Sequence, residues 1–92
     1  MVKSLIYHKV TNFEVWKKEF DNFYKHRKLA GERSYSVGHL KGDPNTAYVI
    51  NEWDDLASYE AFLNSSELSE KMKDAGVLEA PHSIIFEEKN KG

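Results

Sequence analysis

The sequence predicts a single α+β domain over residues 1–92, with a ferredoxin-like βαββαβ order and a four-stranded antiparallel sheet. In four short stretches the apolar residues follow the pattern of β-strands. In the stretches between them, apolar residues recur every three or four positions, as in helices. The sharpest change of period lies in residues 51–77. There the strand pattern ends at Trp53, and the carboxylates of Asp54 and Asp55 can cap the first of two short amphipathic helices.

The first strand and helix are predicted in the N-terminal third of the chain. Residues 3–10 are expected to form an interior strand, because apolar side chains fall on both of its faces. A capping box at Thr11 and Glu14, or Asn12 alone, would start the following helix, and Gly31 would end it. This helix carries one broad and mainly aromatic stripe, which consists of Phe13, Trp16, Phe20, Phe23, Tyr24 and Arg27.

The remaining three strands follow from alternation and turn signals. Residues 34–41 alternate weakly, as edge strands do, and the turn signal at residues 42–45 predicts a hairpin. Residues 46–53 carry apolar groups on both faces, so this third strand is expected in the interior of the sheet. After the helix pair, Pro81 blocks further helix and residues 83–88 form the last strand. The ferredoxin-like order places the first and third strands at the centre, in agreement with their two-faced apolar patterns.

The predicted layers also imply a partner. Helices can cover only one side of a four-stranded sheet, and a chain of 92 residues is near the lower end of what one core supports. The apolar side chains on the other side of the sheet therefore need cover. We expect a homodimer that packs sheet against sheet.

Composition excludes several classes of function. Thirteen Lys and Arg residues against 15 Asp and Glu residues, with both signs interspersed, give a net charge of −2 and no electrostatic footprint for nucleic acid. The absence of cysteine from the sequence excludes disulfides, thiolate zinc sites and cysteine nucleophiles. The sequence contains no glycine-rich phosphate loop, His-Glu-x-x-His metal motif or Gly-x-Ser-x-Gly elbow. Without a signal peptide or a membrane-length apolar run, a cytoplasmic location is the default expectation.

Several motifs resemble one superfamily over nearly the whole chain. They are His8-Lys9-Val10, residues 13–21, Asp43-Pro44-Asn45, Glu52 to Leu56, Phe62 to Ser65 and Ala75-Gly76-Val77. In these motifs the sequence is similar to dimeric α/β-barrel proteins of the antibiotic biosynthesis monooxygenase-like superfamily, in its cyclase-like subgroup. The resemblance implies one pocket per subunit between helices and sheet. It allows cofactor-free oxygenation of aromatic polyketides, cyclisation, isomerisation or haem degradation.

The haem-degrading members differ from this chain at two positions. They carry Trp where Phe62 stands and an iron-ligating His where Met72 stands. Met72 shares helical spacing with other apolar residues, and such a methionine is more often core than ligand. The resemblance therefore favours chemistry that needs no cofactor.

Two polar residues are the candidates for catalysis. His8 lies on the first strand beside the implied cleft and could take a proton near neutral pH, although a strand histidine is more often simply hydrogen-bonded. Asn51 could stabilise a developing oxyanion, or else bond to a neighbouring loop. Glu52 is expected on the opposite face, paired across the dimer interface. Aromatic side chains would form the ligand-binding wall, or alternatively the core; they are Trp16, Phe20, Tyr24, Trp53, Tyr59 and Phe62.

Three hypotheses follow, and they belong to different classes of function. The first is a cofactor-independent monooxygenase or cyclase acting on a small, apolar and aromatic molecule, with His8 as the base. The second is a dimeric binding or stress-response module that holds such a molecule without chemistry. The third is an interaction domain with a filled core, which tight packing of Phe20, Tyr24 and Phe62 would favour.

Overall fold

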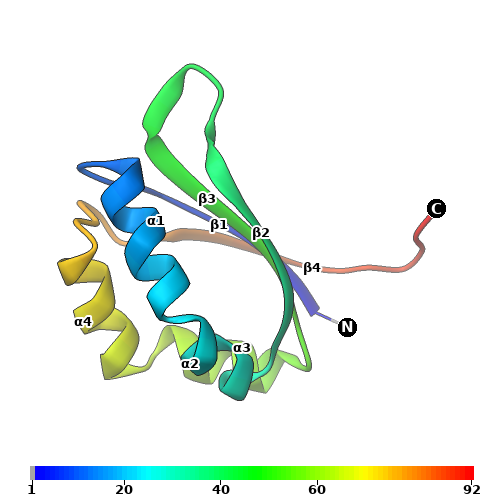
Figure 1. Ribbon diagram of the computed structural model, residues 1–92. Helices are drawn as coiled ribbons and strands as arrows, with labels where there is room; N and C mark the ends of the chain where they lie inside the picture. Colours follow the sequence, from blue (N-terminus) through cyan, green and yellow to red (C-terminus); the bar gives the residue numbers. More distant parts are fainter. Residues whose placement is uncertain (1) are drawn as a thin grey trace.

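Residues 2–92, which a computed structural model describes, form a four-stranded antiparallel sheet with four helices over one of its faces (Figure 1). The strands run in the order β2-β3-β1-β4, so that the first and third strands lie at the centre. Their bounds are β1 Val2–Lys9, β2 Glu32–Leu40, β3 Asp43–Trp53 and β4 His82–Glu87. The order and the antiparallel pairing confirm the predicted ferredoxin-like α+β fold.

The helices come in two consecutive pairs. They are α1 Phe13–Asn22, α2 Tyr24–Ala30, α3 Leu56–Leu63 and α4 Ser66–Asp74. The sequence predicted one helix before Gly31, but the structure divides it at Phe23, whose backbone N–H donates to both the Glu19 and Phe20 carbonyls. Asn12, rather than the capping box, begins α1, because its Oδ1 accepts a hydrogen bond of 3.1 Å from the Val15 N–H.

The hairpin between β2 and β3 is tighter than the sequence predicted. Leu40 pairs with Asp43, so the loop consists of Lys41 and Gly42, and β3 begins at Asp43 instead of Thr46. Gly42 has a φ of 83°, which an L side chain adopts only with strain. The longer pairing projects the hairpin beyond the helices, as Figure 1 shows.

The two faces of the sheet differ in their cover. Facing the helices, the core consists of two clusters: Val10, Trp16, Ala47, Val49 and Ala75 in one, and Phe23, Trp53, Tyr59 and Phe62 in the other. The pairing register places Leu5, Ile50 and Ile84 on the other face, where Figure 1 shows no helix among the residues drawn as ribbon. Ile50, Ile84 and Phe86 are exposed there. The predicted homodimer would cover this outer face.

Helix α4 is held mainly at its ends. Every one of its residues remains at least partly accessible to solvent. After its C-terminal end, the Gly76 carbonyl accepts a bond of 3.0 Å from the Thr11 N–H, and Val77 pairs with Val10. Near its N-terminal end, Glu67 lies 2.9 Å from His26. The middle of α4 is therefore the least firmly packed part of the helical layer.

Replacing Gly76 should destabilise the attachment of α4. Gly76 has a φ of 78°, and an alanine Cβ there would collide with the Thr11 hydroxyl. We expect Gly76→Ala to lower the free energy of unfolding by about 2–3 kcal/mol in urea denaturation, because backbone strain and the collision add.

Gly42→Ala is the matched control. Its φ is also positive, but no described atom lies within 4 Å of the added Cβ. It should cost only about 1 kcal/mol of backbone strain. Adding Thr11→Ala to Gly76→Ala should restore part of the loss, and equal costs for the two glycine variants would contradict this explanation.

Candidate functional site

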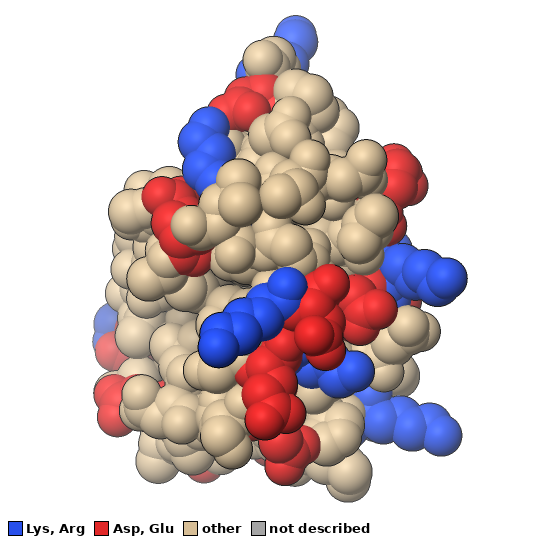
Figure 2. Space-filling model, turned by 90° about the vertical axis from the view of Figure 1, so that its left-hand side faces the viewer, with Lys and Arg blue, Asp and Glu red and all other residues tan. Residues whose placement is uncertain are grey.

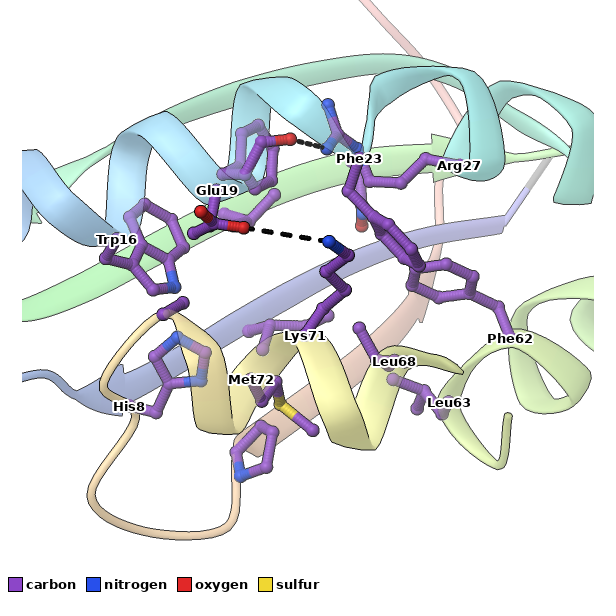
Figure 3. Close-up of a pocket in the computed structure, with 16 residues that line it drawn as sticks. His8, Trp16, Glu19, Phe23, Arg27, Phe62, Leu63, Leu68, Lys71 and Met72 are labelled. Atoms are coloured by element: carbon purple, nitrogen blue, oxygen red, sulfur yellow. Dashed lines mark hydrogen bonds and ion pairs between the residues drawn. The ribbon is translucent and has the colours of Figure 1, made fainter. Parts of the chain in front are cut away.

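A cavity of about 80 Å³ lies between the helices and the sheet, bounded by α1 on one side and α4 on the other (Figure 3). Its accessible wall is almost wholly apolar. The lining residues are Ile6, His8, Val49 and Asn51 from the sheet; Trp16, Glu19, Phe20, Phe23 and Arg27 from the first helix pair; Phe62, Leu63, Leu68, Lys71, Met72 and Ala75 from the second pair and its end; and Pro81.

The cavity is small for a ligand site. An engineered apolar cavity of about 150 Å³ holds one benzene, and sites for drug-sized molecules usually exceed about 300 Å³. A complete aromatic ring would therefore fit only if part of it stayed at the mouth or if the outer wall moved. That wall is α4, which faces the cavity with Leu68, Lys71, Met72 and Ala75 at helical spacing and is held at its ends. Met72, for which the sequence favoured a core position, lines the cavity together with Ala75, which also belongs to the first core cluster.

An ion pair crosses the mouth. Lys71 Nζ on α4 lies 3.8 Å from Glu19 Oε2 on α1, as the dashed line in Figure 3 shows. Both side chains are partly exposed, so the pair contributes little to stability and can open readily. Figure 2 looks onto the helix-covered side and shows acidic and basic side chains next to one another. This face therefore offers both signs of charge to an approaching ligand.

His8 is the polar residue at the base of one end of the cavity. Its side chain packs edge-on against Trp16, with the ring centroids 5.7 Å apart, and only 5% of the residue is exposed. Its Nδ1 atom has no hydrogen-bond partner among residues 2–92. Burial lowers the pKa of His8 to about 4, and the Glu79 carboxylate offsets this only in part. The imidazole is thus neutral at pH 7, whereas the sequence suggested titration near neutral pH.

Asn51 belongs to a chain of buried hydrogen bonds. Its Nδ2 donates to Glu32 Oε2 at 3.0 Å, and its Oδ1 accepts from the Ser4 hydroxyl. Because a carboxylate only accepts, this contact fixes which way the amide points. Asn51 is among the residues that line the cavity, and the network occupies one of its two N–H groups.

Arg27 is the cation of this network, and only 3% of it is exposed. Its Nε lies 3.0 Å from Glu32 Oε1, and its Nη1 donates to the Phe20 carbonyl at the break between α1 and α2. The guanidinium carbon lies 3.6 Å from the centroid of the Phe20 ring. Its Nη2 atom is buried and has no partner within the described part of the chain.

Sequence reasoning missed the role of Arg27 and did not consider Glu32. The sequence placed Arg27 on the mainly aromatic stripe without assigning it a partner. Simple alternation back from Tyr35 would turn Arg33 inward, but an irregularity between Glu32 and Ser34 shifts the register and turns Glu32 inward instead. The available sequence signal for this buried pair was an arginine on an apolar stripe, five residues before a glutamate.

The predicted site residues separate into two groups. His8, Asn51, Trp16, Phe20 and Phe62 line the cavity. The lining does not include the other three, which are Trp53, Tyr59 and Tyr24; Trp53 and Tyr59 occupy the core, which was the stated alternative.

Trp53 and Tyr59 are completely buried in the second core cluster, with ring centroids 5.5 Å apart, and Tyr24 is 42% exposed. Trp53 shares the face of Asn51, but it lies at the end of β3, where α3 packs over it. The Tyr24 ring faces Tyr35, with the centroids 6.1 Å apart. The sequence therefore showed which residues share a face of a strand, but not how deeply each residue is buried or where it lies along the cavity.

Comparison with known proteins supports the fold. No protein-family profile and no curated protein match this sequence. Solved structures do match. An antibiotic biosynthesis monooxygenase is 12% identical, with a TM-score of 0.75 over 98% of this chain and 100% of that one. SnoaB, a cofactor-independent oxygenase from Streptomyces nogalater, is 12% identical, with a TM-score of 0.77 over 98% of this chain and 94% of its own.

A conserved protein from Methanosarcina mazei Go1 is also similar, at 14% identity and a TM-score of 0.73 over 96% of this chain and 92% of that one. At these identities the similarity concerns the fold alone. The chain shares its fold with these antibiotic biosynthesis monooxygenase and oxygenase structures.

Two further findings concern the described residues. Within residues 2–92, no three His, Cys, Asp or Glu side chains converge on a point where they could hold a metal ion. Each helix in this range is too short or too polar to cross a lipid bilayer.

The buried state of His8 should make stability depend on pH. Unfolded His8 binds a proton below pH 6.5, whereas folded His8 binds one only near pH 4. The contribution of neutral His8 to stability is therefore fully present above pH 6.5 and falls as the pH drops from 6.5 to 4. Below pH 4 it falls no further. The loss should total about 3 kcal/mol.

Urea unfolding of the wild type and His8→Gln across this range would isolate the effect, because other titrating groups cancel in the difference. The wild type should lose about 3 kcal/mol more than the variant between pH 7.5 and 4. His39→Gln, on an exposed strand position, should follow the wild type. A difference that stays constant with pH would show that His8 is not buried in its neutral form.

Proposed function

We propose that this protein is a small-molecule enzyme that works without a cofactor, as a monooxygenase or cyclase on a small, apolar and aromatic substrate. The observation that carries the proposal is the apolar cavity with a buried, neutral imidazole at one end, whose Nδ1 atom lacks a partner among the described residues. The shared fold with SnoaB, a cofactor-independent oxygenase, supports the same class of chemistry.

The chemistry would begin with proton transfer. His8 is already deprotonated at neutral pH and could accept a proton from an acidic C–H or O–H group of a bound substrate. Burial makes it a weak base in the free protein, but a substrate anion beside it would stabilise the imidazolium and raise its pKa. The resulting carbanion or phenolate could then react with O₂ or close a ring.

Trp16 and Phe20 would support the aromatic part of the substrate. Their rings stack with centroids 5.3 Å apart and form the α1 wall of the cavity. Opposite them, Met72 offers a flexible side chain that can adjust to the shape of a ligand. Since the present space is small, substrate binding would require α4 to move outward, which its attachment at the ends allows.

Replacing His8 distinguishes the enzyme hypothesis from the hypothesis of a non-catalytic binding module. With single-ring phenols and hydroquinones as probes, we expect wild-type protein to consume O₂ or form a cyclised product, measured with an oxygen electrode and by mass spectrometry. His8→Gln should reduce the rate about a hundredfold or more, since a positioned base supplies about 10²–10⁴. Ligand affinity, followed by Trp16 fluorescence, should change little.

His39→Gln is the control, because His39 lies outside the residues that line the cavity. Binding of the probes without turnover by any of them would instead favour the non-catalytic dimeric module. That module remains the second candidate because the cavity alone, without a base of suitable pKa, is sufficient for binding.

We further propose a cytoplasmic homodimer that packs through the outer face of the sheet. Ile50, Ile84 and Phe86 are exposed there, and Lys3 pairs with Glu88 at 2.8 Å near the edge. Association of two such faces would bury these side chains and offset the small size of the core.

Sedimentation at micromolar concentration should give twice the 10.7 kDa chain mass for the wild type. Ile84→Lys should shift the equilibrium toward monomer by at least about tenfold, because it places a charge in the apolar interface. Leu29→Lys changes a leucine on the helical side that is even more exposed, at 89% against 53% for Ile84, and should leave the dimer intact. A monomeric wild type would disprove the proposed interface.

A further inference from the structure

A second hollow lies on the helical surface, between α2 and the stretch that runs from α3 into α4. We call it the α2–α3 groove. Its volume is about 330 Å³, which falls within the range of about 300–1,000 Å³ that is usual for small-molecule sites. The lining residues are Phe23, His26 and Ala30 along α2, Ser58, Ala61 and Phe62 on α3, and Ser65 and Glu67 at the start of α4.

Small side chains keep this groove open. Figure 1 shows α2 and α3 next to one another, and they are in contact. Ala30 on the α2 wall and Ala61 on the α3 wall end at Cβ, so neither can fill the space between the two helices. The α3 wall follows the spacing i, i+3, i+4 and i+7 of a single helical face, with Ser58, Ala61, Phe62 and Ser65.

Two buried phenyl rings form the base of the groove and separate it from the cavity between helices and sheet. Phe23 and Phe62 line both spaces, with their ring centroids 5.9 Å apart. Figure 3 shows the two rings next to each other, at the end of the cavity away from His8. A ligand in the groove would contact the outer side of these rings. The groove is therefore a separate site, and its ligand does not depend on the chemistry proposed for the cavity.

The charge of the groove is concentrated at one end. Among the lining residues of the described chain, Glu67 alone carries a carboxylate, and its Oε2 lies 2.9 Å from His26 Nδ1. The two side chains are 64% and 58% exposed, so their contact contributes little to stability and opens readily. Whenever the imidazole is neutral, it leaves the negative charge of Glu67 uncompensated.

An anionic ligand fits this end less well than a cationic one. Helix N-termini attract anions, and α4 begins here. However, the Leu68 N–H already donates to Ser65 Oγ at 3.2 Å, and Glu67 places its own carboxylate in the first turn. A ligand carboxylate would meet the like charge of Glu67. An ammonium group would instead replace the imidazole as its partner and form charge-assisted hydrogen bonds.

We propose that the α2–α3 groove binds an arylalkyl amine, with its aromatic ring against Phe23 and Phe62 and its ammonium group at Glu67. Burial of the ring supplies most of the affinity, and the two phenyl groups offer it aromatic contacts. The carboxylate of Glu67 supplies the preference for a cation. The narrow space beside Ala30 and Ala61 suits a flat ring on a short chain.

Three probes of similar length and different charge test this assignment. They are 2-phenylethylamine, 2-phenylethanol and 3-phenylpropionate, used at pH 8, where the amine is still protonated and histidines are ordinarily neutral. In NMR titrations of the wild type, the amine should bind about fivefold more tightly than the alcohol, and the carboxylate most weakly. The backbone signals of Ser58, Ala61 and Ser65 should shift with the amine, whereas those of His8 and Val49 in the cavity should not.

Two variants then locate the ring and the charge. Ala61→Leu should fill the groove and weaken the binding of amine and alcohol alike by about tenfold or more, whereas Ala57→Leu, at an exposed position outside the lining, should not. Glu67→Gln should reduce the preference for the amine over the alcohol to about twofold or less and keep the affinity for the alcohol. Glu60→Gln removes an exposed carboxylate of α3 outside the lining and should keep the preference.

The other outcomes overturn the proposal. Equal affinities for the three probes would show that Glu67 does not select the ligand, and tighter binding of the carboxylate would show that this end attracts anions. Shifts at His8 and Val49 that persist in Ala61→Leu would place the amine in the cavity instead of the groove. Absence of binding by all three probes would show that the groove is no site for a ligand of this class. None of these results bears on turnover by His8, which the oxygen-electrode experiment tests separately.

Discussion

The ion pair between Arg27 and Glu32 is the constraint on which the arrangement of the site depends. Both residues are at least 95% buried, and burial of two charges is tolerable only when they pair and their remaining groups find partners. Glu32 finds Asn51 as its second partner, and Arg27 finds the carbonyl of Phe20. The pair therefore fastens the break between α1 and α2 to the two neighbouring strands β2 and β3.

The same constraint shapes the chemistry. A network that fixes Asn51 on the cavity wall holds a polar group beside an otherwise apolar space. At the other end, burial keeps His8 neutral and so in the form that accepts a proton. Binding groups and a base held this way need no large rearrangement at the moment of reaction. The movable element is the outer wall, α4, which closes the cavity from the solvent side.

Much of the fold could be predicted from the sequence, because local signals agreed with the global order of elements. The change of period after Trp53 and the two-faced pattern of the central strands were sufficient to predict the topology. The helix break at Phe23 was not predicted, because the aromatic stripe of the predicted helix continues across it. The tight turn at Gly42 was not predicted, because several turn residues surround Gly42. Element ends depend on tertiary contacts as well as on propensity.

The site was predictable only in part. Strand alternation grouped His8 with Ile6 and Asn51 with Trp53, but it could not tell which face of the sheet the helices cover. In the structure both His8 and Asn51 line the cavity on the helix-covered face. Alternation could not give the depth of burial, so Trp53 was open to a ligand wall or the core, and the structure places it in the core with Tyr59 and Phe62. The shift of register near Arg33 turned Glu32 inward against the simple alternation, and the buried partner of Arg27 was therefore hidden from sequence reasoning.

A crystal structure of the protein with a bound single-ring phenol would test the central claim most directly. The account predicts the ring between Trp16 and Met72, the phenolic hydroxyl toward His8, and α4 displaced outward to make room. A phenol bound on the outer face of the sheet, or held in the cavity with its hydroxyl away from His8, would contradict the account.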